Sequence, residues 1–524
     1  MIRKKITYSL AGLLLMISCN DQLDRQPLDS LGNTTYWTNT ADAERSVNDV
    51  YRFLGSDERF FMSCATDDSY SWSNWPVDIQ FAANGSATPN TDVFLKNWRY
   101  MYQMIAKAND VLDNIDRVPN MDPTVKAELI GEARFLRAFA YQQLTGLYGD
   151  VVLYTTTPSP EEFQIAKTPK SEIVAFVINE LTEITESLPI TRESAKQGRA
   201  TRGAVLALKA RTLLYSGQWL EAAAAAQQVM DLGVYTIDNN YLSLFNGTNE
   251  NSTEIILSAR YLENTYPNAN ATWIGGPSLA GWGQIVPLRG LVDAYECTDG
   301  QTIDVSPLYD PAAPFANRDP RLGLTIVTPG TPVNGVTIDV TNPNSPDALG
   351  KSNASFSGYY YRKAVPANIS GEWDRSAGAD VMIMRYAEVL LTYAEAKIES
   401  GQIDPSVYAA INQVRQRTGV NMVAATPATH PDQQALRALV RRERHVEFPV
   451  EDNRLFDIRR WGIAENVMQG VAQGIFNNYD SSRGDFNNYV TVERRTFNPG
   501  RDYLWPIPAN ELIFNTQLTQ NSGW

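Results

Sequence analysis

The sequence predicts a mostly helical protein in which helix pairs stack together and a loop-rich, partly β segment is inserted between them. Apolar residues recur every three or four positions in several segments, which is the period of an amphipathic helix. Glycine turns join two of these segments to a following helix. The period is lost over about 261–381, where Gly, Pro, Asn, Ser and Asp are dense.

The expected helices follow from the spacing of their apolar residues. In the first of them, Leu129, Ala133, Leu136, Ala140 and Leu144 recur at intervals of four and three. Each clear segment is followed by a glycine, which readily ends a helix. The segments are 129–147, 202–216 and 384–400, followed by Gly149, Gly217 and Gly401.

Two of these glycines predict helical hairpins. The turn GQWLEA at 217–222 is typical of a tetratricopeptide repeat, with glycine, an aromatic residue, and Glu-Ala beginning the second helix. The turn at Gly401 has a similar layout, and Asp404-Pro405 then opens a helix with a capping aspartate and a first-turn proline. One helix pair cannot bury its apolar face alone, so we expect a tetratricopeptide-like superhelix.

The segment 261–381 is predicted to carry function. A stretch of this length without helical period, inside a helical protein, is more often functional than accidental. Residues 335–341 favour short strands between loops. The apolar, turn-rich segment 503–512 is expected to pack back onto the body of the protein.

The first residues predict a lipoprotein. A basic start at Arg3, Lys4 and Lys5 precedes an apolar run over 10–17, which is too short to span a membrane. Ser18 then precedes Cys19, which is a candidate for lipidation. The alternative is a plain secretory signal in which Cys19 has no role. We expect a signal peptide over 1–18, a lipidated tether over 19–30 and a single domain over 31–524.

Charge and composition exclude some classes of function. The formal net charge of −14 becomes −17 when the three basic residues of the signal are removed. A chain this acidic is not expected to bind nucleic acid through a general basic surface. Hydrophobic residues make up 43% of the chain and charged residues 20%, as is ordinary for a globular protein with a large core.

Cysteine and histidine are too scarce for several kinds of chemistry. Besides Cys19 there are Cys64 and Cys297, which either pair or, as we favour, stay as free buried thiols. The two histidines, His430 and His445, make a zinc site built on several imidazoles improbable. A Ser-His-Asp arrangement has only these two positions for its histidine.

Blocks of residues along the whole chain form a recognisable set. The main blocks are SCN at 18–20, LYGDV at 147–151, RYAEVLL at 385–391, RRER at 441–444, RLFDIRRW at 454–461 and YLWPIP at 503–508. In their order and number these blocks resemble the SusD/RagB-type outer-membrane lipoproteins of the Bacteroidetes, and the C-terminal ones are the most specific. One departure is His445-Val446, where the family more often has arginine.

This resemblance implies a fold and a role. The implied fold is a cradle of tetratricopeptide-like helix pairs around an irregular ligand-binding region. The implied role is a cell-surface, lipid-anchored protein that captures oligosaccharide without catalysis and docks on a SusC-like TonB-dependent transporter. Two alternatives stay open: a RagB-like receptor for peptides or other nutrients, and a surface glycoside hydrolase, for which no motif selects the required pair of carboxylates.

Sugar binding directs attention to aromatic residues in loops, because pyranose rings stack on aromatic faces while polar side chains bond their hydroxyls. Two indoles and a phenol lie within six residues at 70–75, near three aspartates whose charge favours a neutral sugar. Glycine-rich turns and a further loop hold the remaining candidates. Ordinary packing is the competing interpretation for each. The candidates are Tyr70, Trp72, Trp75, Trp273, Trp282, Trp373 and Arg375, and the aspartates are Asp67, Asp68 and Asp78.

Other conspicuous residues are assigned to the scaffold. Four tryptophans in the family-like blocks are predicted to be core: Trp98, Trp219, Trp461 and Trp505. The charged run over 441–452 is interpreted as ion-paired helix faces. No cofactor is predicted. Structural calcium is possible but unassigned, because Asp304, Asp310 and Asp319 offer oxygen ligands without the spacing of an EF-hand.

Overall fold

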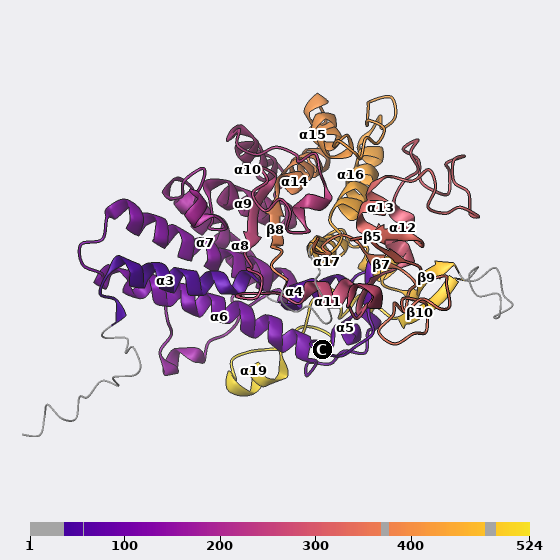
Figure 1. The fold of residues 1–524 in the computed structure, drawn as a ribbon. Helices are drawn as coiled ribbons and strands as arrows, with labels where there is room; N and C mark the ends of the chain where they lie inside the picture. The colour runs from indigo at the N-terminus through magenta and orange to yellow at the C-terminus, as the bar shows by residue number, and fades with distance from the viewer. Residues whose placement is uncertain (1–35, 56, 368–376, 477–488) are drawn as a thin grey trace, which may run out of the picture.

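The computed structural model describes residues 36–55, 57–367, 377–476 and 489–524 (Figure 1). The long helices are α3 (Thr40–Tyr51), α6 (Asp92–Asn114), α7 (Pro123–Tyr148), α8 (Lys170–Ile184), α9 (Arg202–Tyr215), α10 (Trp219–Asp231), α14 (Tyr386–Glu399), α15 (Pro405–Arg415) and α16 (Gln433–Glu447). The short ones are α4 (Asp57–Phe61), α5 (Ile79–Asn84), α11 (Asn270–Ile274), α12 (Arg289–Ala294), α13 (Arg321–Thr325), α17 (Asn453–Arg460), α18 (Ala464–Val467) and α19 (Ala509–Phe514). None of these described helices combines the length and the apolar character needed to cross a membrane.

The long helices form the predicted stack of pairs. Helix α6 packs on α7, α7 on α8, α8 on α9, α9 on α10, α10 on α14, and α14 on both α15 and α16 (Figure 1). The contact between α10 and α14 joins helices separated by more than 150 residues of sequence, so the stack continues across the inserted segment. The helix-pair superhelix predicted from the apolar period is therefore confirmed.

Local signals set the ends of the predicted hairpins. Gly217 and Gly401 both have φ of +75°, the left-handed conformation that glycine adopts without a steric penalty. The side chain of Thr201 accepts a hydrogen bond from the backbone of α9, and Asp404 does the same for α15, where Pro405 follows in the first turn.

The segment between α10 and α14 supplies most of the strands, all of them short. The strands are β1 (Ser69–Ser71), β2 (Ile255–Ala259), β3 (Ile285–Pro287), β4 (Ile326–Val327), β5 (Thr331–Val333), β6 (Val336–Ile338), β7 (Tyr360–Tyr361), β8 (Val381–Arg385), β9 (Gly470–Phe476) and β10 (Tyr489–Arg495). They form five antiparallel pairs: β1–β3, β2–β8, β4–β7, β5–β6 and β9–β10. Strand β6 confirms the strand predicted within 335–341.

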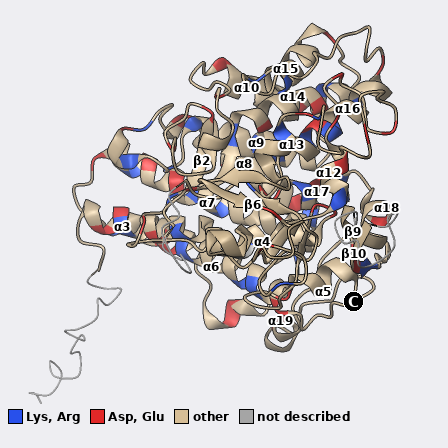
Figure 2. Ribbon diagram, turned by 45° about the vertical axis from the view of Figure 1, so that its right-hand side comes forward, with Lys and Arg blue, Asp and Glu red and all other residues tan. Residues whose placement is uncertain are grey.

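The charged run over 441–452 is ion-paired as predicted, but many of its side chains are buried. Glu447, on α16, bonds to Arg321, Arg385 and Arg417, and all four side chains are inaccessible to solvent or nearly so. Figure 2 shows basic and acidic residues together around α13, α16 and α17. We call the connected set Glu254, Arg321, Lys363, Arg385, Arg415, Arg417, Glu443, Glu447 and Glu451 the buried ion network.

The four scaffold tryptophans divide into two groups. Trp98 and Trp505 are buried in the core as predicted. Trp219 and Trp461 are only half-buried, so their assignment to the core is correct for part of each side chain. The indole of Trp461 donates to Glu395 and lies beside the guanidinium groups of Arg441 and Arg460.

Candidate functional site

The pairing of β1 with β3 brings together two loops that lie about 200 residues apart in the chain. Tyr70 is opposite Val286 in this pair. Beyond the strands, the indole Nε1 of Trp72 donates to the carbonyls of Trp282 and Gly283, at 3.2 and 3.1 Å. The side chain of Gln284 also donates to the carbonyl of Trp75. Five of the predicted aromatic residues, Tyr70, Trp72, Trp75, Trp273 and Trp282, thus meet at one place.

Three indoles form the centre of this cluster. The ring centroid of Trp75 lies 5.3 Å from that of Trp273 and 5.9 Å from that of Trp282, and the last two are 5.2 Å apart. Trp75 is 51% exposed, whereas Trp273 is 2% exposed and also contacts Phe61 in the core. Trp273 was predicted to contact ligand, and its burial corrects this prediction: it supports Trp75 from below.

The glycines around Trp282 allow this close packing. A Cβ atom on Gly281 would lie 2.0 Å from the carbonyl oxygen of Gly275, which is far inside van der Waals contact. The two glycines therefore permit the backbone on either side of η8 (Pro277–Leu279) to approach closely. This approach places the half-buried Trp282 beside Trp75.

Phe356 completes the exposed aromatic surface, although the sequence interpretation did not select it. Its ring is 51% exposed and stacks on Trp72, with centroids 6.2 Å apart and an interplanar angle of 23°. Tyr70 approaches the same ring at 6.0 Å. The sequence pattern that selected the tryptophans could also have selected Phe356, because it is an isolated aromatic residue between Ser355 and Ser357 in a turn-rich segment. We call Trp72, Trp75 and Phe356 the aromatic platform.

Polar groups border the platform. Asn74 is exposed next to Trp75, and its side-chain oxygen accepts a hydrogen bond from Gln80. The Ser73 hydroxyl accepts from the backbone N–H of Trp75 at 3.1 Å. Flat apolar rings beside amide and hydroxyl groups suit a ligand whose faces carry C–H groups and whose edges carry hydroxyls.

The carboxylates of the three aspartates near this loop are bound by other groups of the protein. Asp67 pairs with Arg454 at 2.6 Å; burial alone would raise the pKa of Asp67, but the Arg454 guanidinium lowers it to about 2. Asp68 contacts His445 at 2.6 Å. Asp78 accepts from the first backbone N–H groups of α6, at 2.9 Å. Arg454 and His445 thus contact two of the three carboxylates, which weakens the argument for a neutral sugar from these charges.

Asp304, Asp310 and Asp319, which the sequence offered as calcium ligands, do not form a cluster of ligand atoms in the structure. In the part of the chain that the structure describes, the His, Cys, Asp and Glu ligand atoms that converge belong to Asp67, Asp68 and His445, and not to the 304–319 segment. Asp319 is instead bound to Arg321 at 2.7 Å. Arg454 already holds Asp67 in the converging group.

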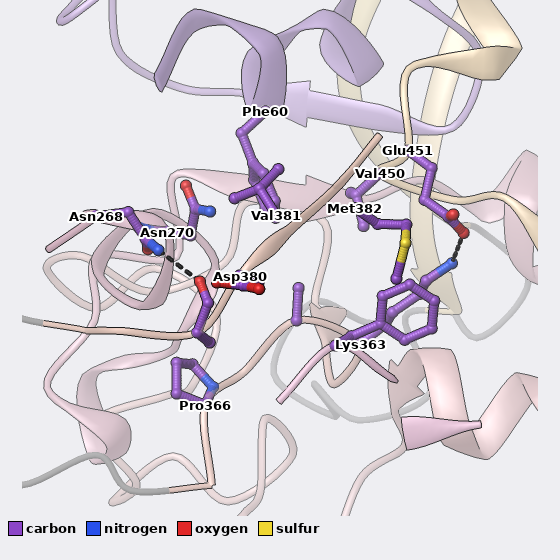
Figure 3. A pocket seen from close by; sticks show the side chains of 13 residues that line it. Phe60, Asn268, Asn270, Lys363, Pro366, Asp380, Val381, Met382, Val450 and Glu451 are labelled. Atoms are coloured by element: carbon purple, nitrogen blue, oxygen red, sulfur yellow. Dashed lines mark hydrogen bonds and ion pairs between the residues drawn. The ribbon is translucent and has the colours of Figure 1, made fainter. Parts of the chain in front are cut away.

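A small internal cavity holds two carboxylates and a lysine (Figure 3). Lys363 donates to Glu451 at 2.5 Å, and burial lowers the pKa of this lysine to about 8. Burial also raises the pKa of Asp380, which lines the same cavity, to about 6. The cavity volume is about 20 Å³, which is room for about one water molecule and not for a sugar ring. Glycoside hydrolysis needs substrate between its two carboxylates, so this cavity does not support it.

Three predicted residues fall outside the described part of the chain. These are the lipidation candidate Cys19 and the loop residues Trp373 and Arg375. The two remaining cysteines, Cys64 and Cys297, are free and buried as we favoured.

Comparison with known proteins places the chain in a family. The sequence profile described as "SusD family" matches residues 243–524, and that described as "Starch-binding associating with outer membrane" matches 23–214. The SusD-like protein P2 of Formosa agariphila is 25% identical over 548 aligned residues, which cover 100% of this chain and 99% of the relative. The chain belongs to the SusD family.

Solved structures agree with this assignment. A SusD-like carbohydrate-binding protein from Bacteroides fragilis has 29% identity and a TM-score of 0.84, covering 93% of this chain and 100% of that one. The surface glycan-binding protein A of Bacteroides thetaiotaomicron, solved with laminarihexaose, has 19% identity and a TM-score of 0.70, covering 92% and 100%. This second likeness shows the shared fold.

Proposed function

We propose that this protein is a non-catalytic, surface-exposed lipoprotein that captures oligosaccharide on the aromatic platform. The observation that carries the proposal is that Trp75 is half exposed while it rests on the buried indole of Trp273. Half of this large apolar ring still faces water, so a ligand that covers it gains hydrophobic free energy. Because the ring is already held by neighbours, the ligand loses little binding energy to ordering it.

Relatives support the class of ligand. A structural neighbour was solved with laminarihexaose, and one of the matching profiles is described as starch-binding. Glucans such as laminarin and starch are therefore the first ligands to test. Phe356, which stacks on Trp72, adds a second half-exposed ring to that of Trp75, as binding to successive sugar residues requires.

The cellular role is proposed from the N-terminal sequence and the family. Lipid on Cys19 would hold the protein at the outer membrane, with which the family description associates it. We propose that the captured oligosaccharide passes to a SusC-like TonB-dependent transporter. Catalysis has no place in this role, and delivery needs only reversible binding.

The test uses the unlipidated chain from Asn20 onward, which contains every described residue. Affinity gel electrophoresis would compare wild type, Trp75→Ala and Phe356→Ala on gels with plant, microbial and host polysaccharides, and released reducing sugar would be assayed in parallel. Phe514→Ala is the matched control, because Phe514 is an exposed phenylalanine outside the platform.

Retardation by one glycan that is lost in both platform variants but kept in Phe514→Ala is the expected result. Retardation that no platform variant changes would place the site elsewhere. Release of sugar would instead support a hydrolase. Binding of peptides, with no retardation by any glycan, would support the RagB-like alternative.

A further inference from the structure

A large cleft lies apart from the aromatic platform. It is bounded by α3, by the turn at 195–199 and by the segment 258–267, and its volume is about 970 Å³. None of its lining residues belongs to the platform, and α3 lies at the far left of Figure 1 while α5 and α11 lie toward the right. Sites for small ligands typically occupy roughly 300–1,000 Å³, so the cleft is large enough for several sugar residues.

The cleft is basic although the chain is acidic. Five cationic side chains line it, against the two carboxylates of Glu44 and Asp49. Among the side chains that line the cleft the cations are therefore in excess, whereas over the whole chain, with its net charge of −14, the acidic residues are in excess. The cations are Arg45, Arg52, Lys196, Arg199 and Arg260.

Three of these cations are held only loosely by the protein. Arg45 makes one 3.1 Å contact with Asp42 while its side chain is 59% exposed. Arg52 reaches Asp49 only at 3.5 Å with 69% of its side chain exposed, and Lys196 reaches Glu193 at 3.8 Å. All three side chains line the cleft and are more than a third exposed, so their charged ends remain accessible to solvent. Exposed ion pairs of this kind contribute little to stability, so a ligand can compete for them.

Arg199 and Arg260 are more firmly fixed. Arg199 bonds both oxygens of the buried Glu132, and Arg260 contacts Asp380 at 2.7 Å. The guanidinium of Arg199 also lies over the ring of Tyr51. Buried carboxylates thus hold these two arginines in place, whereas Arg45 of α3 and Arg52, which directly follows α3, are more exposed.

Tyr266 gives the cleft an aromatic face. Its side chain is 74% exposed, and it lines the cleft beside Pro267. Two backbone hydrogen bonds with Leu262, of 2.9 and 2.8 Å, close the turn that carries it. Amide groups of Asn48 and Gln197 line the same space. An exposed ring on a fixed turn beside amides and guanidinium groups combines stacking with hydrogen-bond donation.

We propose that this cleft is a second carbohydrate site, which binds the anionic part of an acidic oligosaccharide. The recognised group is the carboxylate of a uronic acid or a sulfate ester, because guanidinium groups bind either one through paired N–H donors. Tyr266 stacks on a neighbouring sugar ring. The choice of a sugar, among anionic ligands, rests on the proposed function of the platform.

Calorimetric titration of the chain from Asn20 onward tests this proposal. The probes are an oligogalacturonate, a sulfated galactan oligosaccharide and a neutral laminarin oligosaccharide. Arg45→Gln/Arg52→Gln and Tyr266→Ala alter the cleft, and Trp75→Ala alters the platform. Arg99→Gln/Arg117→Gln is the matched control, since it removes the same charge from exposed positions that do not line the cleft.

The expected result is that an acidic probe binds wild type and binds the cleft variants at least tenfold more weakly. Binding of that probe should weaken from 50 to 200 mM NaCl, as expected for contacts between charged groups in water. The control and Trp75→Ala should bind the acidic probe like wild type. The class of acidic probe that binds identifies the carboxylate or the sulfate ester.

Two outcomes would contradict the proposal of a second carbohydrate site. One is that neither acidic probe binds wild type; the other is an equal loss in the cleft variants and in Arg99→Gln/Arg117→Gln. Failure of the platform proposal would give a different result. Trp75→Ala would then bind every neutral polysaccharide of the panel like wild type, while the cleft variants would still lose binding of the acidic probe.

Discussion

The indoles of Trp75 and Trp273 lie 5.3 Å apart, centroid to centroid, at an interplanar angle of 63°, yet one is half exposed and the other buried. Trp273 also contacts the half-buried Trp282 and, in the core, Phe61. The same ring contact therefore connects the hydrophobic core to the surface. A substitution at the buried Trp273 should therefore affect mainly stability, and one at the exposed Trp75 mainly ligand affinity.

Trp273→Ala should destabilise the protein by about 3–5 kcal/mol, because it leaves a large cavity in the core. Trp75→Ala should cost about 1 kcal/mol or less of stability, since half of its side chain already faces water, but should weaken glycan binding at least tenfold. Urea denaturation followed by tryptophan fluorescence, with titration of the identified glycan, measures both. Equal losses of stability in the two variants would contradict the assigned roles.

Glu447 should make stability depend on pH in the acid range. Burial alone would raise the pKa of this carboxyl, but Arg385, Arg417 and Arg321 outweigh it and hold the pKa well below its usual range. Its folded pKa is depressed, so its contribution to stability is complete above the unfolded value of about 4.3 and is lost as pH falls below it.

Glu447→Gln should therefore destabilise the protein by about 3–5 kcal/mol at pH 7, because Arg321, Arg385 and Arg417 each lose one of their buried carboxylate partners. The difference from wild type should shrink between pH 4.5 and pH 3, where the wild-type carboxyl begins to be protonated on unfolding. Urea midpoints at pH 7, 5, 4 and 3 provide the measurement. A difference independent of pH would show that the Glu447 charge does not stabilise the fold.

Lys363 and Arg385 both bond to Glu451 but should differ in importance. Burial lowers the pKa of Lys363 to about 8, so its charge is disfavoured where it lies, whereas the pKa of Arg385 is raised because the surrounding carboxylates outweigh burial. We expect Lys363→Met to cost less than about 1.5 kcal/mol and Arg385→Met about 3–5 kcal/mol, since only the second leaves several carboxylates short of a partner.

The pH dependence of Lys363→Met provides an internal check. Between pH 8 and about 10.4 the folded wild type has lost this proton while the unfolded chain still holds it. Wild-type stability should therefore rise relative to Lys363→Met over that range. Thermal melts of both proteins at pH 7, 8 and 9.5 measure the trend, and a constant difference would place the pKa of Lys363 at its ordinary value.

The scaffold was predictable from sequence because its signals are local. The apolar period, the glycines at 217 and 401 and the Asp404 cap each act within a few residues. Exposure was not predictable, because the β1–β3 pairing that sets it joins distant loops. Sequence therefore selected Trp75 and Trp273 alike and overlooked Phe356. It also could not show that Glu443 and Glu447 point inward, since a charged helix face looks the same whether water or arginines cover it.

The two cysteines of the described chain should be unreactive in the folded protein. Burial raises the pKa of the Cys64 thiol to about 12, and Cys297 is likewise buried and free. The thiolate is the reactive form of cysteine, and at neutral pH a thiol with this pKa is almost entirely protonated. Burial also keeps reagents away from both sulfur atoms, so we expect slow reaction in the folded protein. Ellman's reagent should titrate no thiol quickly in the native chain from Asn20 onward and two after unfolding in urea without reductant. Finding none after unfolding would show instead that Cys64 and Cys297 form a disulfide, and one fast-reacting thiol in the native protein would contradict the burial of either side chain.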